Sequence, residues 1–270
     1  MRNSSLETNP RFVSLLSGLE GSGFSVYRAD SRCGLSPDTD VLLSVGGDGT
    51  FLSAAALAGD SGIPVLGVNL GRLGFLSENG PETVAEALAG RKYTIENRTL
   101  LNIRTFPEAV PGQTGMWPYA LNEMTVRRSG AAMLGIDVSV DGAALPTYWA
   151  DGLLVATSSG STAYSLSVGG PVVMPESDVF IIAPIASHNL SVRPLVVPGG
   201  ARICVSFRSR DEKVILTADN RTAEVGAETR VEVSAADFPL RKVRIGGMDF
   251  IDALKGKLFW GEDMRNSNGK

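Results

Sequence analysis

The stretch that decides the fold is Val41-Leu42-Leu43-Ser44-Val45-Gly46-Gly47-Asp48-Gly49-Thr50. Its first half is a short, mostly apolar run bounded by Asp40 and by glycines, which predicts a buried strand of a parallel sheet. Its second half is glycine-rich, and glycine permits both a tight turn and a close approach of a ligand to the backbone. Residues 51–57 then favour a helix. This order places Asp48 at the carboxyl end of a strand, where open α/β sheets bind ligands, beside helix-start N–H groups that suit a phosphate.

Taken alone, the same stretch also fits a tight turn in which Asp48 caps the following helix. A second glycine-rich loop, Leu70-Gly71-Arg72-Leu73-Gly74-Phe75-Leu76, comes directly after the next expected strand, Ile63 to Asn69. A second such loop at a strand end favours a ligand site over a plain turn.

Apolar spacing up to about residue 95 alternates between strand and helix, which is typical of a parallel, doubly wound α/β unit. We expect a helix over 10–20, a short strand over 24–27, and a helix over 81–88 that begins at Pro81. Residues 1–98 are therefore expected to form an α/β domain. An amphipathic helix within 249–262 is expected to pack back on it.

Residues 99–248 contain short strands separated by turns, which predicts a β-rich, sandwich-like second domain. Alternation of apolar and polar residues is clearest at Ile136–Val140 and Arg230–Val233. One helix, about Ser161 to Val168, interrupts the strands. The expected strands are 100–106, 119–127, 134–140, 148–157, 179–183, 202–207, 214–218, 230–233 and 243–245.

The composition excludes several functional classes. A hydrophobic content of 43% suffices for a folded core, and the net charge of −4 gives no sign of a nucleic-acid partner. Cys33 and Cys204 lack any metal or redox spacing, so a reducing, cytoplasmic setting is expected. No apolar run approaches the roughly 18 residues of a membrane span, so no membrane partner is expected. The single histidine, His188, disfavours a zinc site, and neither a GxSxG elbow nor a P-loop motif is present.

Two further stretches carry polar groups suited to a ligand. Asn122 and Glu123 follow one another in an expected strand, where neighbouring side chains point to opposite faces unless a bulge intervenes. A solvated strand edge explains this pair alone. From Asp151 to Gly170, a strand ends in a hydroxyl-rich loop that opens a helix, and such a loop suits polar groups of a ligand. Tyr164 is placed to face an aromatic base, although a well-capped helix with Tyr164 in the core also explains this stretch.

Together these stretches resemble the motifs of NAD kinases. The glycine turn alone is shared with diacylglycerol-type lipid kinases and 6-phosphofructokinases, but the long segment Gly160–Ser167 separates NAD kinases from both. The resemblance covers about residues 10–262, in the family's order. The matching segments are Gly46–Thr50, Asn69–Leu76, Asn122-Glu123, Asp151-Gly152, Gly160–Ser167 and Ser187–Pro198.

The resemblance implies phosphoryl transfer from ATP, or polyphosphate, to the 2′-hydroxyl of the adenosine ribose of NAD, giving NADP. Mg²⁺ or another divalent cation is expected with ATP. Asp48 corresponds to the catalytic carboxylate, which takes or orients the hydroxyl proton. Asn122 and Glu123 correspond to dinucleotide contacts, and Asp151 to a contact near the nicotinamide end.

The glycine loops 46–49 and 71–74 would lie against phosphates, and Ser159 with Thr162 to Ser167 corresponds to the adenine and ribose pocket. The family folds as an α/β nucleotide-binding domain and a β-rich NAD-binding domain with the site between them. Its members are homodimers or homotetramers whose sites a neighbour completes. The implied binding residues are Asp48, Gly49, Asn122, Glu123, Asp151, Ser159, Thr162, Ala163, Tyr164, Ser165, Leu166 and Ser167, with no metal ligand among them.

The sequence departs from the family pattern at several positions. Ser158 stands where many relatives have Pro, Trp149 where many have Arg or Lys, and Asn220-Arg221 where many have Gly or Ser followed by Gln. The family opens with a strand that ends in a glycine turn, whereas residues 1–10 here are polar and not strand-like. Without that strand, its neighbour is expected to be unpaired.

Two other functions stay open at this point. A lipid or sphingoid kinase on the shared scaffold would need an apolar acyl channel, which the hydroxyl-rich segment 160–167 argues against. A dinucleotide-binding module without catalysis would bind NAD with no turnover.

Overall fold

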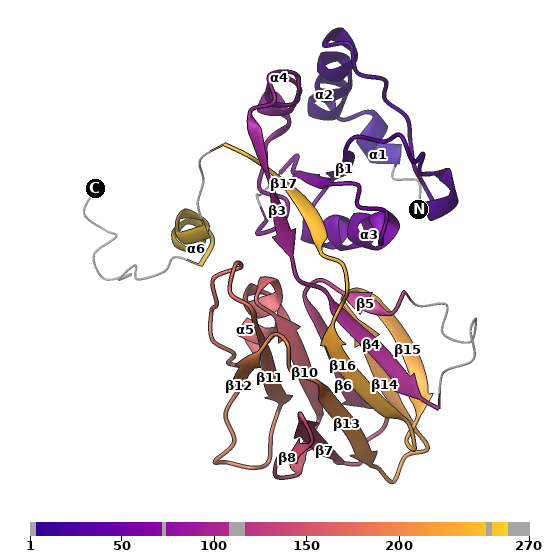
Figure 1. Cartoon of the computed structure of the whole chain (residues 1–270), viewed down its shortest axis with the longest axis vertical. Helices are drawn as coiled ribbons and strands as arrows, with labels where there is room; N and C mark the ends of the chain where they lie inside the picture. The colour runs from indigo at the N-terminus through magenta and orange to yellow at the C-terminus, as the bar shows by residue number, and fades with distance from the viewer. Residues whose placement is uncertain (1–3, 72–73, 108–116, 247–249, 259–270) are drawn as a thin grey trace.

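The computed structural model describes residues 4–71, 74–107, 117–246 and 250–258. Figure 1 shows two regions, one above the other. The α/β region comprises the described residues among 4–98 and 240–258, and the β-sandwich region comprises the described residues among 101–235. Both elements of the expected fold class, an α/β unit and a β-rich unit, are therefore confirmed.

The α/β region is built on a four-stranded sheet in the order β1-β2-β17-β3. Strand β1 (Leu42–Val45) pairs in parallel with β2 (Val65–Val68), which confirms the strand expected in the deciding stretch. Within the described residues β1 is an edge strand. Strand β17 (Leu240–Ile245) is parallel to β2, and β3 (Tyr93–Arg98) is antiparallel to β17.

Helices cover both faces of this sheet, as a doubly wound unit requires. On one face, Leu15 of α2 and Leu88 of α4 pack on Leu66 of β2. On the other, Phe51 of α3 packs on Val65, because neighbouring strand residues point to opposite faces. The helical elements are α1 (Ser4–Glu7), α2 (Pro10–Gly21), η1 (Arg32–Gly34), α3 (Asp48–Ala58), η2 (Pro81–Thr83) and α4 (Val84–Ala89).

The β-sandwich region consists of two antiparallel sheets that enclose the largest apolar core. One sheet has the order β12-β11-β10-β6-β14-β15, and the other has the order β5-β4-β16-β13-β7-β8, with β9 paired to β7. The first sheet contains β6 (Glu123–Arg128), β10 (Gly152–Thr157), β11 (Val179–Ile185), β12 (Leu195–Pro198), β14 (Lys213–Ala218) and β15 (Arg221–Gly226). The second contains β4 (Leu101–Phe106), β5 (Tyr119–Ala120), β7 (Leu134–Val140), β8 (Ala143–Ala144), β9 (Tyr148–Ala150), β13 (Ile203–Arg208) and β16 (Arg230–Ala235).

Four expectations are corrected. The strands expected over 119–127 and 148–157 are each divided between the two sheets of the sandwich, as β5 and β6 and as β9 and β10. The strand expected over 24–27 is absent: Phe24 and Tyr27 are exposed, and the Tyr27 hydroxyl bonds Thr39 and the Ser36 N–H instead of joining a sheet. The strand expected over 243–245 lies in the α/β sheet and not in the sandwich. We therefore propose that the second domain ends near residue 235, and that the chain then returns to the first.

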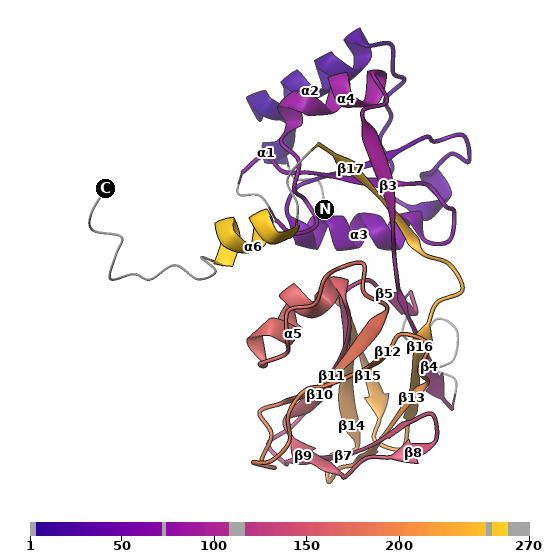
Figure 2. The ribbon, with the colours of Figure 1, turned by 60° about the vertical axis from the view of Figure 1, so that its left-hand side comes forward.

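The C-terminal helix α6 (Phe250–Leu258) contacts the α/β region, with the rings of Phe250 and Phe75 6.2 Å apart. In Figures 1 and 2, α6 lies at the level where the two regions meet. Residues 249 and 259–262 of the expected helix lie outside the described residues. The short helix expected within 161–168 is present as η3 (Ser159–Thr162) and α5 (Tyr164–Ser167).

Candidate active site

Asp48 is the first residue of α3, and its side chain reaches across to another loop. Its carboxylate accepts hydrogen bonds from the N–H groups of Phe75 (2.8 Å), Leu76 (3.0 Å) and Ser77 (2.9 Å). The N-cap of α3 is Gly47, so the simpler interpretation of Asp48 as the cap is wrong. The two glycine-rich loops are thus joined through this carboxylate.

Gly74 is a glycine because Asp48 occupies the space where a side chain would stand. A Cβ built on Gly74 would lie 1.9 Å from Oδ1 of Asp48, far inside van der Waals contact. The loop therefore wraps directly around the carboxylate.

Asn122 lies in the bend between β5 and β6, and Glu123 is the first residue of β6. Asp219, whose φ is 51°, accepts hydrogen bonds from the N–H groups of Leu121, Asn122 and Glu123. Its side chain is fully buried. Oδ1 of Asn122 and Oε2 of Glu123 are buried without a hydrogen-bond partner among the described residues. Because unpaired buried acceptors are costly, this pair is suited to donors from a ligand.

The acidity of Glu123 is strongly altered by its surroundings. Burial, followed by the nearby carboxylate of Asp219, raises the pKa of Glu123 to about 7, and the N–H of Tyr164 partly offsets this rise. Glu123 therefore changes charge near neutral pH.

Asn220 connects this cluster to the start of α3. Its Nδ2 donates to the carbonyl of Gly49 (3.3 Å) and to the Ser53 hydroxyl (3.0 Å). The β14–β15 turn thus holds Asn122-Glu123 through Asp219 and the Asp48 helix through Asn220. One departure from the family pattern, Asn220, is therefore a contact between the two regions.

The loop after β10 packs against the same cluster. A Cβ on Gly160 would lie 2.1 Å from the carbonyl oxygen of Asn122, so only glycine fits there. Ser159 and Thr162 line a pocket with Phe75 of the α/β region. Of the other predicted residues, Ala163, Tyr164 and Leu166 are partly buried, Ser165 is buried and Ser167 is exposed.

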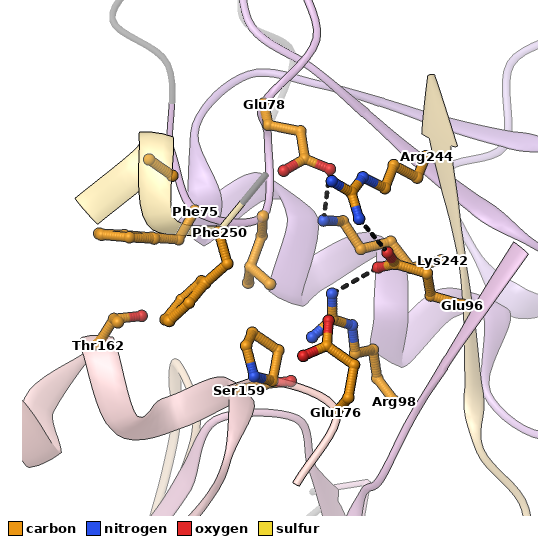
Figure 3. Close-up of a pocket in the computed structure, with 13 residues that line it drawn as sticks. Phe75, Glu78, Glu96, Arg98, Ser159, Thr162, Glu176, Lys242, Arg244 and Phe250 are labelled. Atoms are coloured by element: carbon orange, nitrogen blue, oxygen red, sulfur yellow. Dashed lines mark hydrogen bonds and ion pairs between the residues drawn. The ribbon is translucent and has the colours of Figure 1, made fainter. Parts of the chain in front are cut away.

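The same pocket is also lined by a network of ion pairs, shown in Figure 3. Lys242, only 2% exposed, donates to Glu78 at 2.7 Å. Glu96 pairs with Arg98 at 2.5 Å and with Arg244 at 3.0 Å. Burial by itself raises the pKa of Glu96, but these cations outweigh it, so its pKa lies below the ordinary value. This charged layer, which the sequence analysis did not find, comes from strands and loops far apart in the sequence.

Asp151 is a predicted site residue that, within a single copy of the protein, lies away from this cluster. It lies at the start of β10, whereas Ala156, four residues into that strand, is the partner of Glu123. At about 3.3 Å per residue, Asp151 lies roughly 17 Å along the strand from the Glu123 end. There it pairs with Arg128 at 2.7 Å.

The α/β region carries Asp48 on its glycine turn, and the β-sandwich region contacts that turn through Asn220. Solved kinases share this two-domain arrangement, so the class of protein is a two-domain phosphotransferase. The ATP-NAD kinase N-terminal domain model matches residues 16–91, and the C-terminal domain model matches residues 121–245. The chain belongs to the NAD kinase family, and it phosphorylates NAD to NADP with ATP as donor.

Individual relatives agree with this assignment. The NAD kinase of Flavobacterium psychrophilum is 38% identical over 260 residues, which span 95% of this chain and 88% of the relative. That of Bacteroides fragilis is 40% identical over 232 residues, 84% of this chain and 79% of the relative.

Two solved structures share the fold. An NAD kinase from Archaeoglobus fulgidus in complex with ATP has a TM-score of 0.76 and 27% identity, and the match covers 94% of this chain and 96% of that one. Yeast NADH kinase complexed with NADH has a TM-score of 0.76 and 28% identity, over 84% of this chain and 68% of that one. None of these comparisons favours a lipid kinase or a non-catalytic module.

Proposed function

We propose that Asp48 is the catalytic carboxylate and that the cluster around Asn122 and Glu123 holds the dinucleotide. The observation that carries this proposal is the pair of unpartnered buried acceptors, connected through the Asp219-Asn220 turn to the helix that begins at Asp48. Ligand hydroxyl groups supply the missing donors. In the reaction, the 2′-oxygen bonds to the terminal phosphorus of ATP, the bond to ADP breaks, and the hydroxyl proton passes to Asp48.

The bonding of Asp48 leaves room for this role. A carboxylate offers about four acceptor sites. Three are taken by the N–H groups of the 75–77 loop, which fix its orientation. One site remains for the ribose hydroxyl, so the proton acceptor is held in place before the substrate binds.

We further propose that the segment Ser159–Ser167 encloses the adenine and ribose. Ser159 and Thr162 line the pocket between the regions, and their hydroxyl groups suit the polar groups of a nucleoside. Gly49 is exposed beside Asp48, where the backbone offers a close approach to a phosphate.

The divalent cation is proposed to arrive with ATP. Within the described ranges, no group of three or more His, Cys, Asp or Glu side chains is placed to hold a metal ion. Mg²⁺ bound to the triphosphate would neutralise part of its charge during transfer.

Turnover is measured as NADP formation from NAD, ATP and Mg²⁺, coupled to an NADP-specific dehydrogenase. The purified enzyme contains all the residues proposed here, so it is expected to convert NAD to NADP. NAD bound without turnover would contradict the catalytic role given to Asp48.

NAD affinity is expected to rise with pH through neutrality. With the pKa of Glu123 at about 7, the carboxyl is mostly protonated at pH 6 and mostly ionised at pH 8. Ribose hydroxyls need an acceptor, so the ionised form binds NAD better, by up to about tenfold across that range. Calorimetric titration with NAD at several pH values measures this change, and Glu123→Gln is expected to flatten it. An equally steep profile in Glu123→Gln would contradict the assignment.

We propose that the enzyme is a homodimer or homotetramer in which Asp151 reaches the site of a neighbouring copy. The support is its position, since Asp151 lies at the opposite end of β10 from Glu123 and belongs to no cluster around Asp48. A neighbour would bring it to the nicotinamide end of the dinucleotide.

Complementation between two inactive variants tests this arrangement. Asp48→Asn and Asp151→Asn are each expected to be nearly inactive, whereas co-expressed mixed oligomers, purified through two different tags, recover part of the activity. Recovery occurs because some sites then contain both native residues. Asp137→Asn, which removes a comparable partner of Arg208, serves as the control and is expected to stay active. Mixed oligomers without activity would contradict a shared site.

We propose a cytoplasmic location. Cys33 and Cys204 are both free thiols, which fits a reducing compartment. Among the described residues, no helix is long and apolar enough to cross a membrane.

A further inference from the structure

Lys257, on the C-terminal helix α6, lies against the loop that holds Asp48. Its ammonium group donates to the carbonyl of Gly74 and lies 4.5 Å from the centre of the Phe75 ring. The N–H of Phe75 is one of the three donors to Asp48. Lys257 thus contacts the same loop whose N–H groups bind the proposed catalytic carboxylate.

Within the part of the chain that the structure describes, no ion pair neutralises the charge of Lys257, although the carboxylates of Asp48 and Glu78 act on it from a longer distance. Three other basic side chains near Phe75, namely Arg98, Lys242 and Arg244, all form ion pairs with Glu78 or Glu96. Among the described residues, none forms an ion pair with Lys257 within 4 Å. A half-buried cation without such a partner is costly, and this cost is characteristic of groups kept for a ligand.

Electrostatics place this cation within the field of the site. Burial lowers the pKa of Lys257, while the negative charges of Asp48 and Glu78 counteract that effect and Lys242 adds to it. An ammonium group has three donors. The Gly74 carbonyl takes one, the Phe75 ring faces another, and the third is left for an anion.

We propose that Lys257 is a catalytic residue that binds the terminal phosphoryl group of ATP during transfer to NAD. The proposal rests on the proposed role of Asp48, which places the reacting 2′-hydroxyl beside the 75–77 loop. As the bond from the 2′-oxygen to phosphorus forms and the bond to ADP breaks, charge accumulates on the phosphoryl oxygens. A cation fixed beside them stabilises this charge.

The key variant is Lys257→Gln, because its amide retains a donor for the Gly74 carbonyl but removes the charge. We expect kcat to fall by about 10²-fold, with the calorimetric NAD affinity and the unfolding temperature unchanged. Lys257→Arg keeps the charge and is expected to recover part of kcat. Lys255→Gln is the matched control on the same helix, since Lys255 is exposed and pairs with Asp252 at 3.9 Å, and it is expected to behave as wild type.

Two outcomes would overturn the proposal. One is a wild-type kcat in Lys257→Gln. The other is a parallel loss of kcat, NAD affinity and unfolding temperature that Lys257→Arg does not relieve, since that pattern means Lys257 only anchors α6. Asp48→Asn, assayed alongside, separates the two hypotheses: normal turnover in that variant rejects the role of Asp48, whatever Lys257→Gln does.

Discussion

Replacing Asp48 with Asn is expected to lower kcat for NADP formation by about 10²- to 10⁴-fold. The amide cannot take up the hydroxyl proton, and it has one acceptor oxygen instead of two. That oxygen can keep the bonds to Leu76 and Ser77, which both go to Oδ1, so the loop should stay in place. The N–H of Phe75, which now donates to Oδ2, would instead face the amide NH2 group, which is also a donor. Losing this hydrogen bond costs about 1–3 kcal/mol of folding free energy.

The coupled NADP assay measures kcat, and calorimetry with NAD shows whether the variant still binds its substrate. Asp60→Asn is the control, because Asp60 lies just past the other end of α3, where it pairs with Arg32 at the surface. Near-normal turnover by a folded Asp48→Asn enzyme would show that the carboxylate neither takes nor orients the proton.

Breaking the Lys242–Glu78 pair is expected to cause the largest loss of stability. Lys242 is 2% exposed, and its Nζ lies 2.7 Å from Glu78. Glu78→Met leaves a buried ammonium group without its nearest counter-charge, which costs about 3–5 kcal/mol. The unfolding temperature should therefore fall by roughly 10 °C, as measured by thermal denaturation followed by circular dichroism.

The double variant Glu78→Met with Lys242→Met is expected to recover most of that loss, because an apolar pair in place of a buried ion pair is often neutral. Glu86→Gln is the control, since the Glu86–Lys92 pair is exposed and its loss should leave the unfolding temperature unchanged. A double variant no more stable than Glu78→Met would mean that packing, and not the uncompensated charge, accounts for the loss.

Local pattern was sufficient for most of the fold. The apolar run before Gly46 predicted β1, and the helical spacing over 10–20 predicted α2. Strands β3, β12 and β15 were not predicted, because their alternation is interrupted by polar or exposed residues, as in Tyr93–Arg98. The prediction of a strand over 24–27 was wrong because its local pattern is strand-like, but no described strand pairs with it.

Part of the candidate site was also accessible from the sequence. Asp48 and the hydroxyl-rich loop were found through their local motifs. Phe75 was noted only as a member of a glycine-rich loop, and its contact with α6 depends on a helix that begins at residue 250. The Asp219-Asn220 turn appeared only as a departure from the family pattern, yet it joins the two regions.

The class of fold, the family and the residues of the local motifs could be predicted from the sequence, because each is encoded in neighbouring residues through periodicity, glycine and hydroxyl groups. The partners of those residues became known only from the folded chain. It brought Gly74 against Asp48, aligned Asp219 with the N–H groups of 121–123, and moved β17 and Lys257 back to the first region. The physical reason is that hydrogen bonds, buried charges and excluded side-chain volume act over a few ångströms in space, whatever the separation along the chain.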